Sequence, residues 1–309
     1  MVLKTGRVME QVDKMLDLMK QGVVPWKRDW SKPPAANWRT KRPYSGFNVL
    51  ILSLPSDVYN CPFWDTFRGI RSEGGRVRTG EKGTQIIIRK TITAEEKNEN
   101  GEKKLVQKSF MGCHTVFNLA QTTLSKQYNK YKKTVTTSFS SVEDVINSYQ
   151  KKFDGNPVIR HGYSLSPCYK PNSDIIELPE THTYTHPLRY EVSRFHELIH
   201  STGHSSRLDR NLSPLNTDKE AYSKEELVAE IGSVIALGLC GVDTSDIIES
   251  SASYAYSWHT VLRQDKVVLM QACTEAFKAA YFLVGDHIPR RTERESEDKE
   301  DQTCVSSAV

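Results

Sequence analysis

The sequence predicts an α+β protein, with a small N-terminal α+β domain followed by a mainly helical domain that contains a short sheet. Its 309 residues exceed the length of one typical domain, so we expect two hydrophobic cores. The polar segment 120–140, rich in Lys, Thr and Ser, is typical of a linker. We therefore place the domains at 1–135 and 141–285. Residues 286–309 are highly charged with almost no apolar side chains, so we expect a disordered tail.

The first domain mixes helical and extended patterns. Residues 4–21 have apolar positions at helical spacing, and this spacing stops at Gly22. The patterns that follow are an apolar segment at 48–54, a short helix at 62–75, two strands joined by a Gly-rich turn at 76–90, a polar hairpin tip at 94–104 and a returning strand at 106–119.

Helical spacing dominates the second domain. We predict a helix at 141–153 and a short strand at 174–178. Further helices follow near 188–202, 223–240 and 252–284. This order, with strands few and helices long, is the basis for a mainly helical domain with a short sheet.

Composition argues against a membrane protein, a secreted protein and a disulfide-rich protein. Hydrophobic residues make up 38% of the chain, and no apolar run approaches the roughly 18 residues of a membrane span. The N-terminus has no apolar stretch of the kind found in secretory signals. Six cysteines are scattered without a CxxC pair, which argues against disulfides and against a thiolate zinc site. We expect a cytoplasmic protein with no membrane partner.

Charge is distributed unevenly along the chain. Residues 1–135 contain 25 of the 42 Lys and Arg and 12 of the 38 Asp and Glu, a net charge of +13, whereas the rest has a net charge of −9. A basic domain usually binds a polyanion, and nucleic acid is the commonest one in the cytosol. The alternative is an ordinary solvated charged surface.

Aromatic residues accompany the basic ones. Four of the five tryptophans lie within the first 64 residues. Single-stranded DNA requires this combination, because bases stack on aromatic rings while cations contact phosphates. The predicted DNA contacts are Trp38, Arg39, Tyr44, Trp64, Arg68, Arg78 and Lys82. The alternative is that Trp26, Trp38 and Trp64 are core residues. The run 75–82 lacks the Lys and Ser/Thr of a P-loop, so we predict a phosphate-facing turn there and no nucleotide site.

A metal motif lies in the second domain. Residues 196–200 read HELIH, so helical spacing places His196 and His200 one turn apart on one face, where both imidazoles reach one cation. Glu197 then lies beside the metal and can take a proton from bound water. The alternative is a surface helix that happens to carry two histidines. Apolar Phe195, together with the leucine and isoleucine inside the motif, favours a buried active-site helix.

A catalytic zinc needs a third protein ligand and an open position for water. Glu226 and Glu230 lie four residues apart in the next predicted helix, and spacing leaves both open. Glu226 would otherwise form a capping box with Ser223. We favour Glu226 as the ligand and Glu230 as a second carboxylate that orients a ligating histidine. His204 is a rival ligand, although Gly203 favours an end of the helix just before it. The candidates for stabilising an anionic transition state are His204, Tyr222, Tyr254 and His259.

Several longer runs together resemble the ArdC-type antirestriction proteins of mobile genetic elements. In the second domain these runs are HELIHSTGHSSRLDR (196–210), AYSKEELVAEIGS (221–233) and YAYSWHTVL (254–262). In the first domain they are VPWKRDW (24–30), NWRTKRPYSGFNVLILSL (37–54), FWDTFRGIRSEGGRVRTGEKG (63–83) and VFNLAQT (116–122). The resemblance covers nearly the whole chain except the charged tail.

The resemblance implies a single-stranded-DNA-binding domain joined to a zincin-like metallopeptidase domain. It implies zinc ligands at His196, His200 and Glu226, with Glu197 catalytic. The expected partners are single-stranded DNA and an unidentified protein substrate. Two other hypotheses remain: a DNA-binding or DNA-mimicking antirestriction factor whose zinc domain is only structural, and a primase-accessory factor in conjugation.

Overall fold

The computed structural model describes residues 5–97, 103–163, 166–212, 219–247, 252–287 and 291–293. Its helices are α1 (Thr5–Lys20), α2 (Phe47–Tyr59), α3 (Phe67–Ser72), α4 (Ser125–Thr134), α5 (Val142–Lys152), α6 (Pro187–Ser201), α7 (Lys219–Leu239), α8 (Ala252–Leu262) and α9 (Lys266–Val284), with short 3₁₀ turns η1 (Leu119–Gln121), η2 (Thr181–Thr183) and η3 (Gly285–His287). Its strands are β1 (Ala36–Asn37), β2 (Phe63–Thr66), β3 (Thr84–Lys97), β4 (Lys103–Asn118), β5 (Val135–Thr137), β6 (Val158–His161), β7 (Cys168–Lys170), β8 (Ile175–Leu178) and β9 (Arg291–Glu293). This composition confirms the predicted α+β class.

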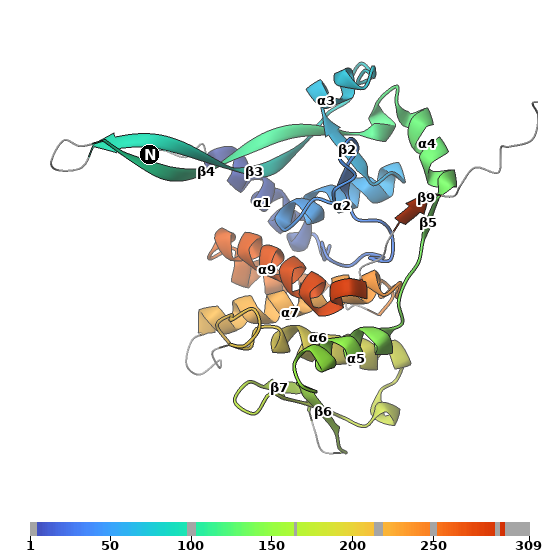
Figure 1. The fold of residues 1–309 in the computed structure, drawn as a ribbon, viewed down its shortest axis with the longest axis vertical. Helices are drawn as coiled ribbons and strands as arrows, with labels where there is room; N and C mark the ends of the chain where they lie inside the picture. The colour runs from blue at the N-terminus through green and yellow to red at the C-terminus, as the bar shows by residue number, and fades with distance from the viewer. Residues whose placement is uncertain are drawn as a thin grey trace, which may run out of the picture.

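The N-terminal part is built on a sheet with the strand order β1-β2-β4-β3. Strands β3 and β4 pair antiparallel from Thr84 opposite Val116 out to Lys97 opposite Lys103, and Figure 1 shows this hairpin as a long arm. The predicted helix at 62–75 is instead strand β2 followed by α3. The change occurs at Thr66, whose hydroxyl accepts a hydrogen bond from the Gly69 amide at 3.0 Å and caps α3. The apolar segment at 48–54 forms part of the buried helix α2.

The C-terminal part contains α5 to α9 and a small sheet with the order β6-β8-β7. Strand β8 pairs parallel with β6 and antiparallel with β7, which leaves β7 at an edge. The single helix predicted at 252–284 is two helices, α8 and α9. Asp265 separates them, because its carboxylate accepts a hydrogen bond from the Val267 amide at 2.8 Å and starts α9.

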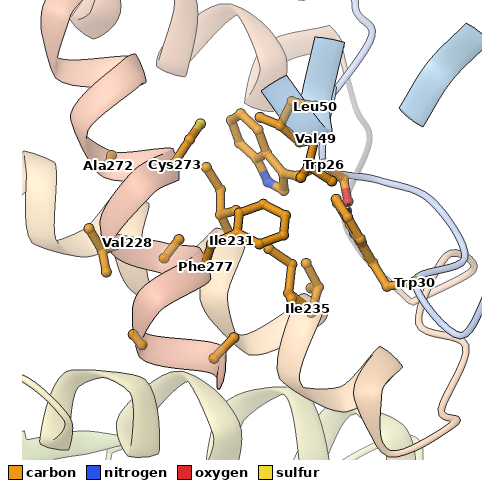
Figure 2. Close-up of a cluster of buried hydrophobic side chains, with 14 of the residues drawn as sticks. Trp26, Trp30, Val49, Leu50, Val228, Ile231, Ile235, Ala272, Cys273 and Phe277 are labelled. Atoms are coloured by element: carbon orange, nitrogen blue, oxygen red, sulfur yellow. Dashed lines mark hydrogen bonds between the residues drawn. The ribbon is translucent and has the colours of Figure 1, made fainter. Parts of the chain in front are cut away.

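The main hydrophobic core belongs to both parts of the chain, which corrects the expectation of two cores of ordinary size. Trp26 and Trp30 lie buried beside Leu50 in the N-terminal half and pack against α7 and α9. Figure 2 shows these rings among Ile231 and Phe277. The Trp30 and Phe277 rings meet edge to face with centroids 6.0 Å apart. Only a small second cluster around Phe63 is confined to the N-terminal part, among the described residues.

Two further expectations need correction. The predicted linker 120–140 contains α4 and β5. Strand β5 pairs with β9, so residues 291–293 of the predicted disordered tail form a strand. Positions 288–290 and 294–309 lie outside the described residues.

Helix α9 is long and apolar enough to cross a membrane by length and composition alone. However, 56% of its apolar window is buried inside the protein. In Figure 1 it lies between the N-terminal part and α7, as expected of a core helix.

Candidate metal centre

Helix α6 presents the HExxH residues. It begins with Pro187, whose fixed φ suits a first helical position, after His186, whose ring nitrogen accepts from the Leu188 amide at 3.1 Å. Phe195, Leu198 and Ile199 are fully buried and hold the helix against the core. This apolar face leaves the two metal-motif histidines on the opposite side, as the sequence predicts.

Helix α7 brings Glu226 to the same place. The Nε2 atoms of His196 and His200 lie 3.1 Å apart. The Glu226 carboxylate lies 3.4 Å from His196 Nε2 and 3.6 Å from His200 Nε2. In a tetrahedral zinc site with bonds of about 2.0–2.1 Å, neighbouring ligand atoms lie roughly 3.3 Å apart. Two imidazoles and one carboxylate at this spacing fit a single divalent cation.

The alternatives for the third ligand can now be compared with the structure. Helix α7 starts at Lys219, so Ser223 lies inside the helix and cannot form the capping box with Glu226. His204 follows the end of α6, and its ring bonds the Ser206 hydroxyl at 2.8 Å. Among the described residues, the group able to hold a metal consists of His196, His200 and Glu226.

Glu197 lies in the same pocket as the three candidate ligands. This pocket has a volume of about 370 Å³, and Cys168, Tyr169 and Tyr222 also line it. The Glu197 side chain is 6% exposed. Burial raises the pKa of its carboxyl, while the nearby histidines oppose this shift. A partly desolvated carboxylate beside these candidate ligands could exchange a proton with a water molecule held by a metal there.

A carboxylate that the sequence reading passed over orients His200. Glu225 Oε1 lies 3.2 Å from His200 Nδ1. Glu225 in turn accepts two hydrogen bonds from the Arg210 guanidinium, at 2.7 and 2.9 Å. Burial raises the pKa of Glu225, but the hydrogen bonds from Arg210 and His200 outweigh it and lower the pKa overall.

The prediction that Glu230 is this supporting carboxylate is therefore corrected. Glu230 lies near Tyr254 and helps burial to raise the pKa of that phenol. Its charge also acts on His196, but the hydrogen bond to a ligating histidine comes from Glu225. Sequence spacing favoured Glu230 because it lies one helical turn from Glu226. No local pattern distinguishes Glu225, because its partner Arg210 lies 15 residues earlier in the chain.

Of the four residues predicted as candidates for stabilising an anionic transition state, one lines the metal pocket. Tyr222 lines the metal pocket, and its phenol bonds Glu226. Burial raises the pKa of that carboxyl, but the two histidines and, to a smaller extent, Tyr222 outweigh it and lower the pKa overall. His204, Tyr254 and His259 are not among the residues that line this pocket. His259 is buried and stacks on Tyr256 with ring centroids 5.8 Å apart.

Two of the predicted DNA-stacking rings are core residues. Trp64 is fully buried, and its indole nitrogen donates to the Ser56 hydroxyl at 2.8 Å. Trp38 is 8% exposed, with the Lys41 ammonium 2.9 Å from its ring centroid. Neither ring presents a free face, so the prediction that they stack on bases is wrong for this conformation. Tyr44 is half-buried, and burial raises its pKa.

The predicted basic contacts divide into two groups. Arg39 forms an ion pair with the buried Asp65 at 2.8 Å, so its charge is already partnered. Arg68, Arg78 and Lys82 are exposed. The Arg78 guanidinium donates to the Ala120 carbonyl at 2.8 Å. This hydrogen bond fixes the orientation of the side chain, and a neutral carbonyl leaves its positive charge unpaired by an anion.

An exposed aromatic ring beside these cations was missed. Phe67, the first residue of α3, is 51% exposed and contacts the Phe117 ring edge to face at 6.4 Å. Sequence reading favoured tryptophans for stacking, and no local pattern distinguishes an exposed ring from a buried one.

Both parts of the chain match known protein families. Residues 7–117 match the family described as the N-terminal domain of anti-restriction factor ArdC, and residues 153–275 match the zincin-like metallopeptidase family. The metal-free crystal structure of the antirestriction ArdC protein from the R388 plasmid matches with a TM-score of 0.68 and 30% identity, covering 89% of this chain and 95% of that one. Its Mn(II)-bound structure matches with a TM-score of 0.67 and 28% identity, covering 90% and 98%. The fold and this metal-bound relative indicate a divalent-metal site.

Curated relatives also match over most of this chain. The DNA primase TraC of Escherichia coli is 29% identical over 89% of this chain, and a second DNA primase TraC from the same organism is 28% identical over 88%. This chain spans only 27% and 19% of those two proteins. Protein y4eC of Sinorhizobium fredii (strain NBRC 101917 / NGR234) is 26% identical over 84% of both chains.

Proposed function

Because this chain belongs to the ArdC-type antirestriction proteins, with an ArdC N-terminal domain and a zincin-like metallopeptidase domain, we propose that it binds single-stranded DNA through the first domain and cleaves a protein through a zinc site in the second. We place this activity in the cytoplasm, where cysteines stay reduced. The described cysteines are free thiols, in keeping with that location.

One observation carries the peptidase proposal: three ligand atoms converge from α6 and α7 at tetrahedral spacing, with Glu197 in the same pocket. A purely structural zinc is usually closed by four protein ligands and needs no general base. Here three side chains converge, which matches the ligand number of a catalytic site. The two-nitrogen, one-carboxylate set suits zinc.

When bound, zinc would polarise the scissile carbonyl and lower the pKa of a water molecule. Glu197 acts as the general base, because its buried carboxylate lies in the pocket with the three candidate ligands. Tyr222 lines the pocket, and rotation of its O–H away from Glu226 would let the phenol donate a hydrogen bond to a developing negative charge. Glu225 holds His200 so that its Nε2 lone pair faces the metal position.

The DNA-binding proposal rests on a set of exposed residues in the segment 67–82, which we call the α3 surface: Phe67, Arg68, Arg71, Arg76, Arg78 and Lys82. All these side chains are exposed. The cations neutralise phosphates and Phe67 offers a face for a base, which is the combination that single strands require. Stacking tolerates any base, so little sequence preference is expected.

The experiment that tests both activities uses the full chain purified with its native metal. Elemental analysis should find about one zinc per chain. A mixture of proteome-derived peptides should be cleaved by the wild-type protein and not by Glu197→Gln, and labelled single-stranded DNA should be bound by both. Cleavage that is equal in the two proteins would overturn the peptidase proposal. The similarity to DNA primase TraC supports no priming activity here, because this chain spans only about a quarter of that protein.

A further inference from the structure

A second pocket lies in the N-terminal part, where α1 and α2 meet the start of β3. Its volume is about 390 Å³, and it shares no lining residue with the metal pocket. Its walls are apolar on one side, from Met15, Leu18 and Ile51. Its polar lining comes from α1 and from the start of β3, and it consists of Glu10, Gln11, Lys14, Thr84 and Gln85. A concave pocket that combines apolar side chains with converging polar groups is the ordinary form of a small-ligand site.

The two amides in this lining are unsatisfied. Gln11 is 4% exposed, and its Nε2 donor has no hydrogen-bond partner. The Oε1 acceptor of Gln85 is also buried and has no partner. Buried polar groups are normally paired, so each unpaired one needs an explanation. The terminal torsion of Gln is broad, so either amide can turn towards an occupant with little strain.

The pocket adjoins the α3 surface. Gly83 lines the pocket, and a Cβ at this position would meet the Thr115 side chain first and the Phe117 ring at 3.0 Å. Phe117 contacts the exposed Phe67. Lys82, next along the chain from Gly83, is exposed, and Lys14 stands in the pocket lining. The pocket therefore begins one residue along the chain from Lys82, a cation of the α3 surface, and its own lining contains the oppositely charged pair Glu10 and Lys14.

We propose that this pocket receives one nucleobase of a bound DNA single strand, an inference that rests on the proposed DNA binding. On its Watson–Crick edge each unpaired base carries a donor beside an acceptor, which matches one amide donor and one amide acceptor. The apolar walls would cover the faces of the base, and Lys14 would lie towards its phosphate. Because all four bases offer such a pair, the pocket distinguishes a base from no base and reads little sequence.

The test measures anisotropy of labelled single-stranded oligonucleotides on the full chain. The first set of oligonucleotides carries a base at every position. In the second set each oligonucleotide has the same sequence but lacks one base, and the abasic position differs from one oligonucleotide to the next. Gln11→Met and Gln85→Met remove each amide at similar volume, and Gln21→Met, an exposed position just after α1, is the control. We expect each variant to bind the complete oligonucleotide about 5-fold more weakly, the effect of one lost hydrogen bond, with an unchanged salt slope. The control should bind like the wild type.

The abasic set makes the assignment specific. For the wild type, an abasic residue at one position of the strand should weaken binding more than an abasic residue elsewhere. Gln11→Met should bind all the abasic oligonucleotides equally, because the substitution and the missing base remove the same contact. Free deoxynucleosides should also give saturation-transfer NMR signals with the wild type that Gln11→Met lacks. Oligonucleotide binding without any effect of Gln11→Met or of the abasic position would overturn the pocket and leave the proposed function intact. Nucleoside signals without oligonucleotide binding would overturn the proposed function and leave the pocket.

Discussion

Glu225 and His200 are joined by a contact of 3.2 Å between a carboxylate oxygen and Nδ1, on the side of the imidazole away from the other candidate ligands. If Nδ1 carries the proton, Nε2 presents its lone pair to the metal position. Arg210 keeps Glu225 in place and also donates to the Ile199 carbonyl at 2.8 Å and to the Thr202 hydroxyl at 2.8 Å. The loop after α6 is thus tied to α7 and to the end of α6 by one buried guanidinium.

The first prediction concerns this contact. Glu225→Gln and Arg210→Met should each weaken zinc binding by about 10–100-fold, because the histidine loses its fixed orientation. Zinc affinity measured by competition with a chelator checks this. Glu226→Ala should bind zinc still more weakly, since it removes a ligand. Glu230→Gln is the matched control, and a loss as large as that of Glu225→Gln would restore Glu230 as the supporting residue.

The second prediction separates chemistry from binding. Glu197→Gln should keep zinc and the fold but lose peptide hydrolysis, because an amide cannot accept the proton of water. Rates should fall by about 10²–10⁴-fold, the usual effect of losing a general base. Peptide cleavage is followed by mass spectrometry alongside elemental analysis. If antirestriction activity in cells survives this substitution, that activity depends on DNA binding and does not depend on peptide hydrolysis.

The third prediction follows from the shared core. Gly238 on α7 packs so tightly on Trp30 that an added Cβ would lie 2.6 Å from the Trp30 carbonyl oxygen. Gly238→Ala should therefore lower the free energy of unfolding by about 1–3 kcal/mol through overpacking. Gly112→Ala is the control, because the nearest atom to its Cβ lies 3.9 Å away. Calorimetry should show one transition for the whole chain, and metal should raise its midpoint. Two separate transitions would mean that the two parts fold independently.

The fourth prediction concerns acid stability. Arg207, whose side chain is fully buried, donates to both oxygens of Asp174 at 2.6 and 2.9 Å, and Tyr169 donates a third hydrogen bond at 2.8 Å. Burial raises the pKa of Asp174, but these bonds outweigh it and lower the pKa below its ordinary value of 3.8. The stability from this carboxylate is therefore fully present above about pH 3.8 and lost as pH falls through the lowered pKa.

Asp174→Asn should destabilise the protein by about 3–5 kcal/mol at pH 7, because Arg207 is left as a buried charge without its partner. The difference from wild type should begin to shrink below about pH 3.8, where the unfolded wild-type chain binds a proton at Asp174, and should be lost below the lowered pKa of the folded protein. Urea unfolding at several pH values measures this. The double change Asp174→Asn with Arg207→Met should recover part of the loss at pH 7. A difference that does not depend on pH would show that the ion pair is not responsible.

The metal site was more accessible to sequence reasoning than the DNA surface, and the reason is physical. His196 and His200 belong to one helix, so local 3.6-residue periodicity predicts their common face. Glu225 could not be chosen over Glu230 by spacing, because Arg210 reaches it from a loop 15 residues earlier. Such a contact depends on how α6 and α7 pack. For the tryptophans, local sequence suggested DNA contacts that tertiary packing removes. Trp64 lies in a basic, aromatic stretch, yet the packing of β2 on α2 buries it.

The same limit applies to the domain boundary. Composition separates a basic half from an acidic half, but charge lies on surfaces and does not report where the core is. Trp26 and Trp30 precede the sheet of the N-terminal part and yet pack against α7 and α9. A fragment of residues 1–135 would expose these rings to water, so DNA binding should be measured on the full chain.

The last prediction tests the α3 surface. Phe67→Ala should weaken binding of single-stranded DNA by about 5-fold or more, since stacking of one base contributes roughly 1–3 kcal/mol. The dependence of affinity on salt should not change, because no cation is lost. Lys82→Ala and Arg68→Ala should instead reduce the slope of log affinity against log salt by about 0.7 each, the effect of one phosphate contact on a single strand.

Anisotropy titrations with single-stranded and duplex oligonucleotides at several salt concentrations measure both effects. Val58→Ala is the matched control, because Val58 is an apolar side chain that is 84% exposed on α2, outside the α3 surface. Wild type should prefer the single strand, since base pairs hide the faces that stack on Phe67. Equal affinity for duplex and single strand, together with an unchanged Phe67→Ala, would mean that phosphates alone are recognised. In that case the exposed ring would have no part in DNA binding, and the cations would remain as a non-specific surface.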